Sequence, residues 1–359
     1  MSRKKLTLLL ILTLMLSGCG GGTAEGSPAP DPSPEPVPTA APTPEPTPTP
    51  YDGPINPLTG LPLLSGTPED RPIAIMLNNL KGALPQLGVS RADIIYELLA
   101  EGGITRMLGI YQSVEGVGNI GSVRSSRPYY LELALGHDAV YLHAGGSPDA
   151  YAKIRAWNVT ALDCVNGPYE GTLFWRDAWR RRNLGYEHSV ITSGETITTL
   201  FPGYAFRKRH ASSYTYKMSF SQDGTPKGGR TAAEVKVPFS QYKTGVFTYE
   251  PETGTYLVSE YGKPYVDGNT GEQVAVTNLL ILRTRCSNIP GDAYGRITVD
   301  LEGGEGWFAC GGRSVPIRWE KEAPDGQLCY QTEDGRPLLL GQGRSYVCIV
   351  PTGSAVEFS

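Results

Sequence analysis

The chain has 359 residues and a formal net charge of −4, and 40% of its residues are hydrophobic, so it can bury a core and is neither a disordered nor a collagen-like chain. The slightly acidic balance excludes a generally basic nucleic-acid binder, because affinity for phosphate backbones comes mainly from Lys and Arg. The length suggests two domains at roughly 150 residues each.

The N-terminus carries the pattern of a lipoprotein signal peptide. Basic residues 3–5 precede an eleven-residue apolar run from Leu6 to Leu16. Eleven helical residues rise only about 16 Å, which is too short for a bilayer core of roughly 30 Å. Residues 16–19 (Leu-Ser-Gly-Cys) resemble a bacterial lipobox. We therefore predict a signal peptide over 1–18 and acylation of Cys19, for example by palmitate, which anchors the chain at the outer face of the cell membrane. An ordinary secretory signal is the alternative.

A Pro-rich linker follows the anchor, over residues 19–54. Eleven of the thirty prolines lie between Pro28 and Pro50, alternating with small and acidic residues. Proline withholds backbone donors and no apolar period exists here, so neither helix nor sheet is expected. A polyproline II spacer of this length reaches on the order of 90 Å. The segment is either a stalk that lifts the body off the membrane or a tether of no set length.

Residues 55–210 alternate strand-like runs with helical stretches, which predicts a mixed α/β domain. The expected strands are 71–79, 93–99, 106–112 and 138–143, and 101–103 link the second to the third. The expected helices are 128–135 and 148–157. Ser126 can cap the first helix, and Ser147 followed by Pro148 opens the second.

Residues 211–359 read as a β-rich domain. Short apolar runs separated by Gly, Asp and Asn turns indicate antiparallel hairpins. The expected strands are 234–237, 245–249, 255–258, 274–284, 296–301, 306–309 and 346–350. The fold class predicted for the whole chain is therefore α/β (α+β), an α/β sandwich followed by a β-rich domain.

The cysteines and histidines predict neither a metal site nor a cofactor. No Cys-x-x-Cys pair and no His-x-x-x-His pattern is present. One or two disulfides and buried free thiols are equally compatible with the five cysteines that follow Cys19. They are Cys164, Cys286, Cys310, Cys329 and Cys348.

Two polar segments share one layout and form a candidate ligand-binding cradle. In each, a strand leads through small residues to a helix N-terminus, where backbone N–H groups and the helix dipole favour anions. Arginine can grip phosphate or carboxylate with two parallel bonds. The candidate binding residues are Arg106, Arg124, Ser125, Ser126, Arg127, His143, Gly145, Gly146 and Ser147. The alternative is that Arg124 and Arg127 form structural ion pairs with nearby carboxylates.

Three carboxylates with even spacing precede these arginines. Asp93, Glu97 and Glu101 would share one face if the strand continued through all three. Asp93, Glu97 and His143 are the candidate general acids or bases of a catalytic site.

The motifs together resemble the YerB-like lipoproteins of Gram-positive bacteria, a family whose biochemical function is uncharacterised. The resemblance covers residues 55–357 and implies an N-terminal α/β sandwich and a C-terminal β-rich domain. Family members usually carry Pro-His-Asn where this chain has Glu187-His188-Ser189. The matching segments are 56–60, 71–74, 92–97, 101–106, 121–127, 143–147, 174–177, 317–321 and 341–351.

Three functions fit these observations. The first is a membrane-anchored protein of the cell envelope, outside the cytoplasm, that binds an anionic or glycan ligand through the Arg/Ser/Gly cradle. The second is an envelope-polymer hydrolase or phosphoryl-linked transferase that uses the same pocket. The third is a structural adaptor without a small-molecule ligand. Membrane contact through the lipid anchor is expected in each case, nucleic acid is not a predicted partner, and the sequence does not indicate an oligomeric state.

Overall fold

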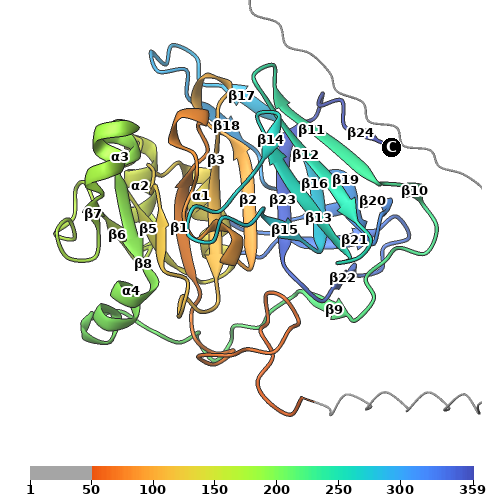
Figure 1. The fold of residues 1–359 in the computed structure, drawn as a ribbon, viewed down its shortest axis with the longest axis horizontal. Helices are drawn as coiled ribbons and strands as arrows, with labels where there is room; N and C mark the ends of the chain where they lie inside the picture. The colour runs from red at the N-terminus through yellow and green to blue at the C-terminus, as the bar shows by residue number, and fades with distance from the viewer. Residues whose placement is uncertain (1–50) are drawn as a thin grey trace, which may run out of the picture. The chain divides into compact units, whose positions relative to one another are not determined.

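The computed structural model describes residues 51–359, so the predicted signal peptide, Cys19 and nearly all of the Pro-rich linker lie outside the described residues. Residues 51–359 form one unit built around an eleven-stranded sheet to which both halves of the sequence contribute (Figure 1). The strand order is β10-β20-β19-β16-β23-β2-β3-β1-β5-β6, with β21 paired to β20.

The strands and helices predicted in the first half are confirmed within one or two residues. Alternating or continuous apolar runs produce the strands, and Pro at the first helical position begins both helices. The confirmed elements are β1 (Ile73–Asn78), β2 (Ile94–Leu99), β3 (Thr105–Tyr111), β5 (Val140–His143), α1 (Pro128–Gly136) and α2 (Pro148–Ala156). A short strand that was not predicted, β6 (Ala161–Asp163), follows α2.

The last long strand, β23 (Ser345–Pro351), joins the two halves. It pairs in parallel with β2 on one side and with β16 (Asn278–Thr284) on the other. In Figure 1 the blue β23 accordingly lies beside the orange β2. The sheet continues through the antiparallel strands β19 (Gly303–Cys310), β20 (Arg313–Glu320), β21 (Cys329–Thr332) and β10 (Arg230–Thr231).

A six-stranded antiparallel sheet covers one face of the large sheet. Its hairpins match the predicted runs around 234–258. The strands are β11 (Glu234–Ser240), β12 (Lys243–Glu250), β13 (Thr255–Glu260), β14 (Lys263–Pro264), β15 (Ala275–Val276) and β24 (Glu357–Phe358). The single strand predicted over 274–284 is wrong, because the chain leaves this sheet after Val276 and enters the large sheet at Asn278.

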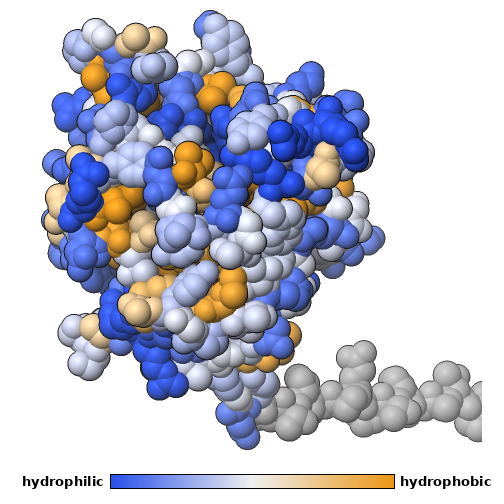
Figure 2. Space-filling model, turned by 90° about the vertical axis from the view of Figure 1, so that its left-hand side faces the viewer, coloured by the Kyte–Doolittle hydropathy of each residue, from blue (hydrophilic) through white to orange (hydrophobic). Residues whose placement is uncertain are grey.

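The remaining elements are short. A three-stranded sheet comprises β4 (Asn119–Gly121), β7 (Trp175–Arg176) and β8 (Val190–Ser193), and two strand pairs combine β9 (Ser219–Ser221) with β22 (Leu339–Gly341) and β17 (Cys286–Asn288) with β18 (Ile297–Val299). The other helices are α3 (Ala178–Asn183) and α4 (Gly194–Leu200). The face of the body that includes α3 and β7 mixes polar side chains with separate apolar patches (Figure 2).

Two hydrophobic cores lie on opposite faces of the large sheet. The odd-numbered residues of β1, such as Ile75 and Leu77, pack with Val235 and Phe247 of the six-stranded sheet. The even-numbered residues, such as Met76, pack under α1. Each face therefore has its own cover, as the period of two in a strand requires.

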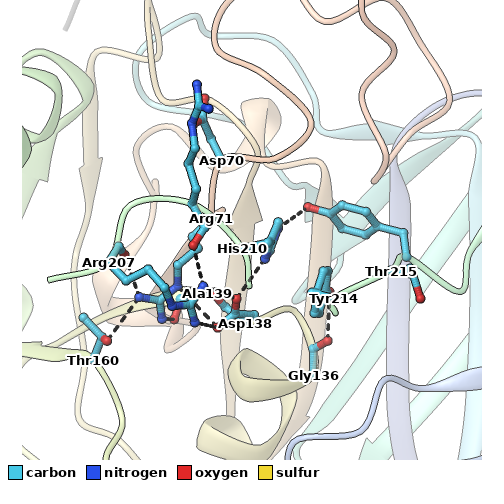
Figure 3. A network of polar contacts seen from close by, with 12 residues as sticks. Asp70, Arg71, Gly136, Asp138, Ala139, Thr160, Arg207, His210, Tyr214 and Thr215 are labelled. Carbon is cyan, nitrogen blue, oxygen red and sulfur yellow. Dashed lines mark hydrogen bonds and ion pairs between the residues drawn. The ribbon is translucent and has the colours of Figure 1, made fainter. Parts of the chain in front are cut away.

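The segment between the two halves is held to the large sheet by the polar contacts in Figure 3. Arg71 donates from Nε to the carbonyl oxygen of Asp138 (2.6 Å) and from Nη1 to that of Arg207 (2.8 Å). Arg207 Nη2 lies 2.6 Å from Asp138 Oδ1. Because Arg71 lies just before β1 and Asp138 lies in the turn before β5, the connecting segment is tied to the end of the large sheet that β1, β5 and β6 form.

Candidate functional site

The carboxyl ends of three parallel strands meet at one edge of the large sheet. β1, β5 and β6 run in the same direction and end at Asn78, His143 and Asp163. The N-termini of α1 and α2 lie at this edge as well, because α2 follows β5 directly and α1 ends just before β5 begins. In sheets of this kind, ligands bind outside the carboxyl ends of the strands.

The two segments predicted to form a cradle lie side by side at this edge. Ala144 N–H donates to the carbonyl oxygen of Arg124 at 3.0 Å, and Ser126 N–H donates to that of Gly145 at 2.9 Å. Ser126 and Gly146 form a parallel bridge. The structure therefore joins 124–126 and 144–147 into one continuous surface.

The two serines at the helix starts differ. Ser147 caps α2 as predicted, with its side chain accepting from the N–H of Ala150 at 3.2 Å. The predicted cap by Ser126 is wrong. The N-cap position of α1 is Arg127, and Ser126 Oγ points inward and accepts from the hydroxyl of Tyr141 at 2.9 Å.

Three arginines and one glutamate form what we call the arginine cluster: Arg106, Arg124, Arg127 and Glu101. Arg127 binds Glu101 through two parallel hydrogen bonds, Nε to Oε2 at 3.0 Å and Nη2 to Oε1 at 2.7 Å. Arg106 also contacts Glu101 Oε1 and donates from Nη1 to the carbonyl oxygen of Ser125 at 3.0 Å. Arg106 and Arg127 thus share one carboxylate, so the alternative of structural ion pairs is right for Arg127 and wrong for Arg124.

Arg124 is the member of the cluster that lacks a carboxylate. Its Nη1 donates to the carbonyl oxygen of Glu187 at 2.8 Å, and no side-chain carboxylate within residues 51–359 lies within 4.0 Å of its guanidinium. Its Nε, like that of Arg106, is buried without a hydrogen-bond partner in the described part of the chain. Burial and the neighbouring charge of Arg106 lower the pKa of Arg124 to about 10. The cluster therefore carries positive charge that its own carboxylate does not balance.

His143 is buried behind the cradle. Its Nδ1 lies 2.8 Å from the carbonyl oxygen of Gly145 and 3.8 Å from Asp163 Oδ1. Asp163 in turn accepts from Gly145 N–H at 2.7 Å and from the hydroxyl of Tyr151 at 2.6 Å. Burial lowers the pKa of His143, although the Asp163 carboxylate opposes the shift. These contacts orient the glycine turn, so His143 and Asp163 support the shape of the cradle.

The candidate carboxylates do not line up beside the arginines. Leu98 is the cross-strand partner of Arg106, so Glu97 and Arg106 face opposite sides of the sheet. Glu101 lies beyond the end of β2, in a turn where Gly102 has a φ of 65°, so the strand alternation does not reach it. Asp93 lies at the other end of β2 and accepts from Asn56 Nδ2 at 2.9 Å and Gln112 N–H at 2.6 Å. The predicted row of Asp93, Glu97 and Glu101 is therefore wrong.

Glu97 belongs to a buried ionic cluster between the large sheet and the six-stranded sheet. Its Oε1 lies 3.3 Å from Lys243 Nζ and accepts from Asn79 Nδ2 at 2.7 Å. Its Oε2 accepts from the hydroxyl of Tyr346 at 2.5 Å. Lys243 also contacts Glu260, so one ammonium serves two carboxylates.

Several residues at these places were not predicted from the sequence. Asp163 ends the short apolar run of β6, which was too short to be recognised. His188, in the segment that departs from the family pattern, accepts at Nδ1 from Asn78 Nδ2 at 2.9 Å and so closes the carboxyl end of β1. Lys243 and Glu260 sit on hairpin strands far along the chain from Glu97, and nothing in their local pattern distinguishes them from exposed residues.

Other features of the described residues bear on the class of site. All five cysteines that follow residue 51 are free thiols. Residues 51–359 contain no group of three or more His, Cys, Asp or Glu side chains that could hold a metal ion. No helix in this part of the chain is long and apolar enough to cross a membrane.

The fold and the edge site define an α+β protein whose two sequence halves share one sheet. The chain belongs to the DUF3048 family of proteins of unknown function: the N-terminal domain of that family matches residues 58–207 and the C-terminal domain matches residues 235–347. It is 32% identical over 314 residues to YerB of Bacillus subtilis (strain 168), a protein provisionally named a lipoprotein, with 84% of this chain and 88% of that protein covered. The crystal structure of B. subtilis YerB is also similar, with a TM-score of 0.71 at 29% identity over 84% of this chain and 99% of that one.

Proposed function

We propose that the chain is a lipoprotein of the cell envelope, held at the outer face of the membrane through Cys19, that binds an anionic ligand with its arginine cluster. The lipobox-like ending of the predicted signal peptide and the provisional name of the B. subtilis relative support the anchor. The Pro-rich segment then separates the binding body from the membrane.

Arg124 is the observation that carries the binding proposal. It shares the cluster with two other guanidinium groups and a single carboxylate, and its Nε is buried without a partner in the described residues. Buried donors and like charges at close range are unfavourable unless an opposite charge compensates them. A phosphate or carboxylate group at the cradle supplies that charge, and the turn at Gly145 and Gly146 lets it approach the backbone.

Binding is better supported than catalysis. A general acid or base must lie within hydrogen-bond reach of the reacting group. Asp93 and Glu97 lie away from the arginines, and His143 is buried behind the cradle with its Nδ1 against a carbonyl oxygen. We therefore propose a glycan ligand only if the glycan carries an anionic group.

The test is calorimetric binding of polyglycerol phosphate to the full chain in detergent, with neutral chitotetraose as the comparison glycan. We expect binding of the phosphate polymer alone, and a loss of about tenfold or more in Arg124→Ala, because a charge-assisted hydrogen bond contributes about 1.5–3 kcal/mol. Arg318→Ala, at an exposed position on β20, is the matched control and should bind as the unmodified chain does.

Mass spectrometry of the polymer after incubation separates the remaining functions. If the unmodified chain shortens the polymer and Arg124→Ala does not, the hydrolase or transferase is favoured. Equal affinity in Arg124→Ala and Arg318→Ala would remove the arginine cluster as the site and favour the adaptor.

A further inference from the structure

A cleft lies between the helices of the first half and the turns of the second half, away from the arginine cluster. Its volume is about 440 Å³, within the range of ligand sites, and sites of this kind occur preferentially where two parts of a fold meet. α1 contributes Glu132, α2 contributes Lys153, and Trp157 follows α2. The opposite wall comes from the turns that follow β18 and β20. The cleft shares no lining residue with the arginine cluster.

Charges of both signs face this cleft without pairing. Within the described residues, Glu132, Glu302, Lys153 and Lys321 have no ion-pair partner within 4.0 Å. Arg285 and Asp300, by contrast, pair with each other at 3.0 Å. The unpaired set holds two ammonium groups and two carboxylates.

Lys321 is the most informative of these groups. It is only 5% exposed, and the carbonyl oxygen of Ala323 is the one acceptor that its Nζ has among residues 51–359, although an ammonium group carries three donors. Burial lowers its pKa to about 8, and the carboxylate of Glu132 partly offsets the shift. Burial likewise raises the pKa of Glu132, which Lys321 opposes. The two groups therefore influence each other across a gap that neither closes.

Trp157 provides an apolar surface beside these charges. Its ring is half-buried, and Lys153 Nζ lies 4.5 Å from the ring centroid, so the cation is held over the aromatic face rather than by a carboxylate. A ligand that reaches both walls thus meets an aromatic ring, an ammonium group and a carboxylate within one cleft.

We propose that this cleft binds a small zwitterion, with the chemistry of a free amino acid or a short peptide, whose carboxylate pairs with Lys321 and whose ammonium group pairs with Glu132. Such a ligand supplies both missing counter-charges at once. A simple anion leaves Glu132 unpaired, and a simple cation leaves Lys321 unpaired. The affinity of the site is therefore expected to depend on both ends of the ligand.

The test is calorimetric titration of the full chain in detergent with alanyl-alanine and with two analogues that each lack one charge, N-acetyl-alanyl-alanine and alanyl-alanine amide. We expect the dipeptide to bind and each analogue to bind about tenfold or more weakly, since a hydrogen bond to a charged group contributes about 1.5–3 kcal/mol. Titration with the L,L and the D,D forms of alanyl-alanine shows whether the cleft prefers an ordinary peptide, built of L residues, or a cell-wall peptide that ends in D residues.

Two variants assign the charges to residues. In Lys321→Met the dipeptide and its amide should bind equally weakly, and in Glu132→Gln the dipeptide and its N-acetyl form should do so. Lys227→Met, at an exposed position, is the control and should leave all affinities unchanged. Glu132→Gln removes only a charge at a half-buried position, so it tests the proposal even if Lys321→Met lowers stability.

The proposal is overturned if the dipeptide does not bind at millimolar concentration, or if the capped analogues bind as well as the dipeptide. Both results are independent of polyglycerol phosphate binding, which Arg124→Ala reports and the cleft variants should not change.

Discussion

Nδ1 of His210 lies 2.9 Å from Oδ2 of Asp138, and Nε2 of the same ring lies 2.7 Å from the hydroxyl of Tyr216 (Figure 3). Asp138 stands in the turn before β5, whereas His210 belongs to the segment that leads to the second half of the sequence. The Tyr214 ring stacks on His210 at 4.1 Å. This contact therefore attaches the connecting segment to the sheet that both halves share.

Asp138→Asn should lower stability at neutral pH. Burial disfavours the charged carboxyl, but hydrogen bonds from His210 and Arg207 outweigh burial and lower its pKa from 3.8 to about 2. Stability from a lowered pKa is present above the unfolded value and disappears as the pH falls through the folded value. The shift corresponds to about 2 kcal/mol, to be measured by urea unfolding at pH 7 and near pH 2. Asp52→Asn, at an exposed position, is the control.

Asp93 should respond to pH in the opposite direction. Burial raises its pKa from 3.8 to about 6, against the hydrogen bonds from Gln112 and Asn56 that favour the charged form. Because the folded state holds this proton more tightly, the contribution of Asp93 falls as the pH rises from about 4 to 6. Carboxyl ¹³C NMR should find one Asp titrating near 6, absent in Asp93→Asn. A titration near 4 would contradict the assignment.

In the buried ionic cluster, Lys243→Met should be more destabilising than Glu260→Gln. Removing the lysine leaves Glu97 and Glu260 buried without a counter-charge, whereas Glu260→Gln leaves one balanced pair. Breaking a buried pair on one side costs about 3–5 kcal/mol. Urea unfolding of both variants measures the order, and an equal loss would show that Lys243 does not serve both carboxylates.

Glu101→Gln should strengthen anion binding while lowering stability. Glu101 occupies the donors of Arg127 and contacts Arg106, so it competes with any anion at the arginine cluster. We expect a gain of about threefold to tenfold for polyglycerol phosphate, the effect of about 1 kcal/mol of released interaction. Weaker binding in this variant would mean that Glu101 orients the arginines for the ligand.

Cys19→Ala should release the chain from the membrane. The predicted lipid chains contribute about 0.8 kcal/mol for each buried methylene group, and without them no second anchor is predicted. Fractionation of cells followed by immunoblotting should find the Cys19→Ala chain in the medium and not in the membrane fraction. Cys329→Ala, which removes a half-buried free thiol, should stay in the membrane fraction. Membrane retention of Cys19→Ala would contradict the lipid anchor.

The sequence predicts the local elements well where periodicity and caps agree. The apolar runs of β1, β2 and β3, Pro128 and the Ser147 cap each identify their element, because propensity and burial favour the same structure there. β20 was not predicted, since Pro316 interrupts its pattern, and the three-residue β4 and β6 are too short to show a period.

The candidate site was only partly predictable for a related reason. The cradle segments and their arginines stand out because each follows a strand and precedes a helix. Glu97 was misplaced beside them because the alternation of β2 indicates a face and does not indicate what covers it. Lys243, 146 positions further along the chain, supplies that cover, and no local pattern connects the two.

The features of this protein divide into those that near neighbours in the sequence decide and those that only the tertiary structure decides. The sequence by itself predicted the lipid anchor, and it determined the order of the main strands and the residue types that gather at helix starts, because these depend on near neighbours. Only the tertiary structure decided that β23 inserts between the halves, that Arg124 lacks a carboxylate partner within the described residues, and that Lys321 faces Glu132 across a cleft. Those relationships arise when strands distant in sequence pair, and strand pairing follows from burying both faces of one shared sheet.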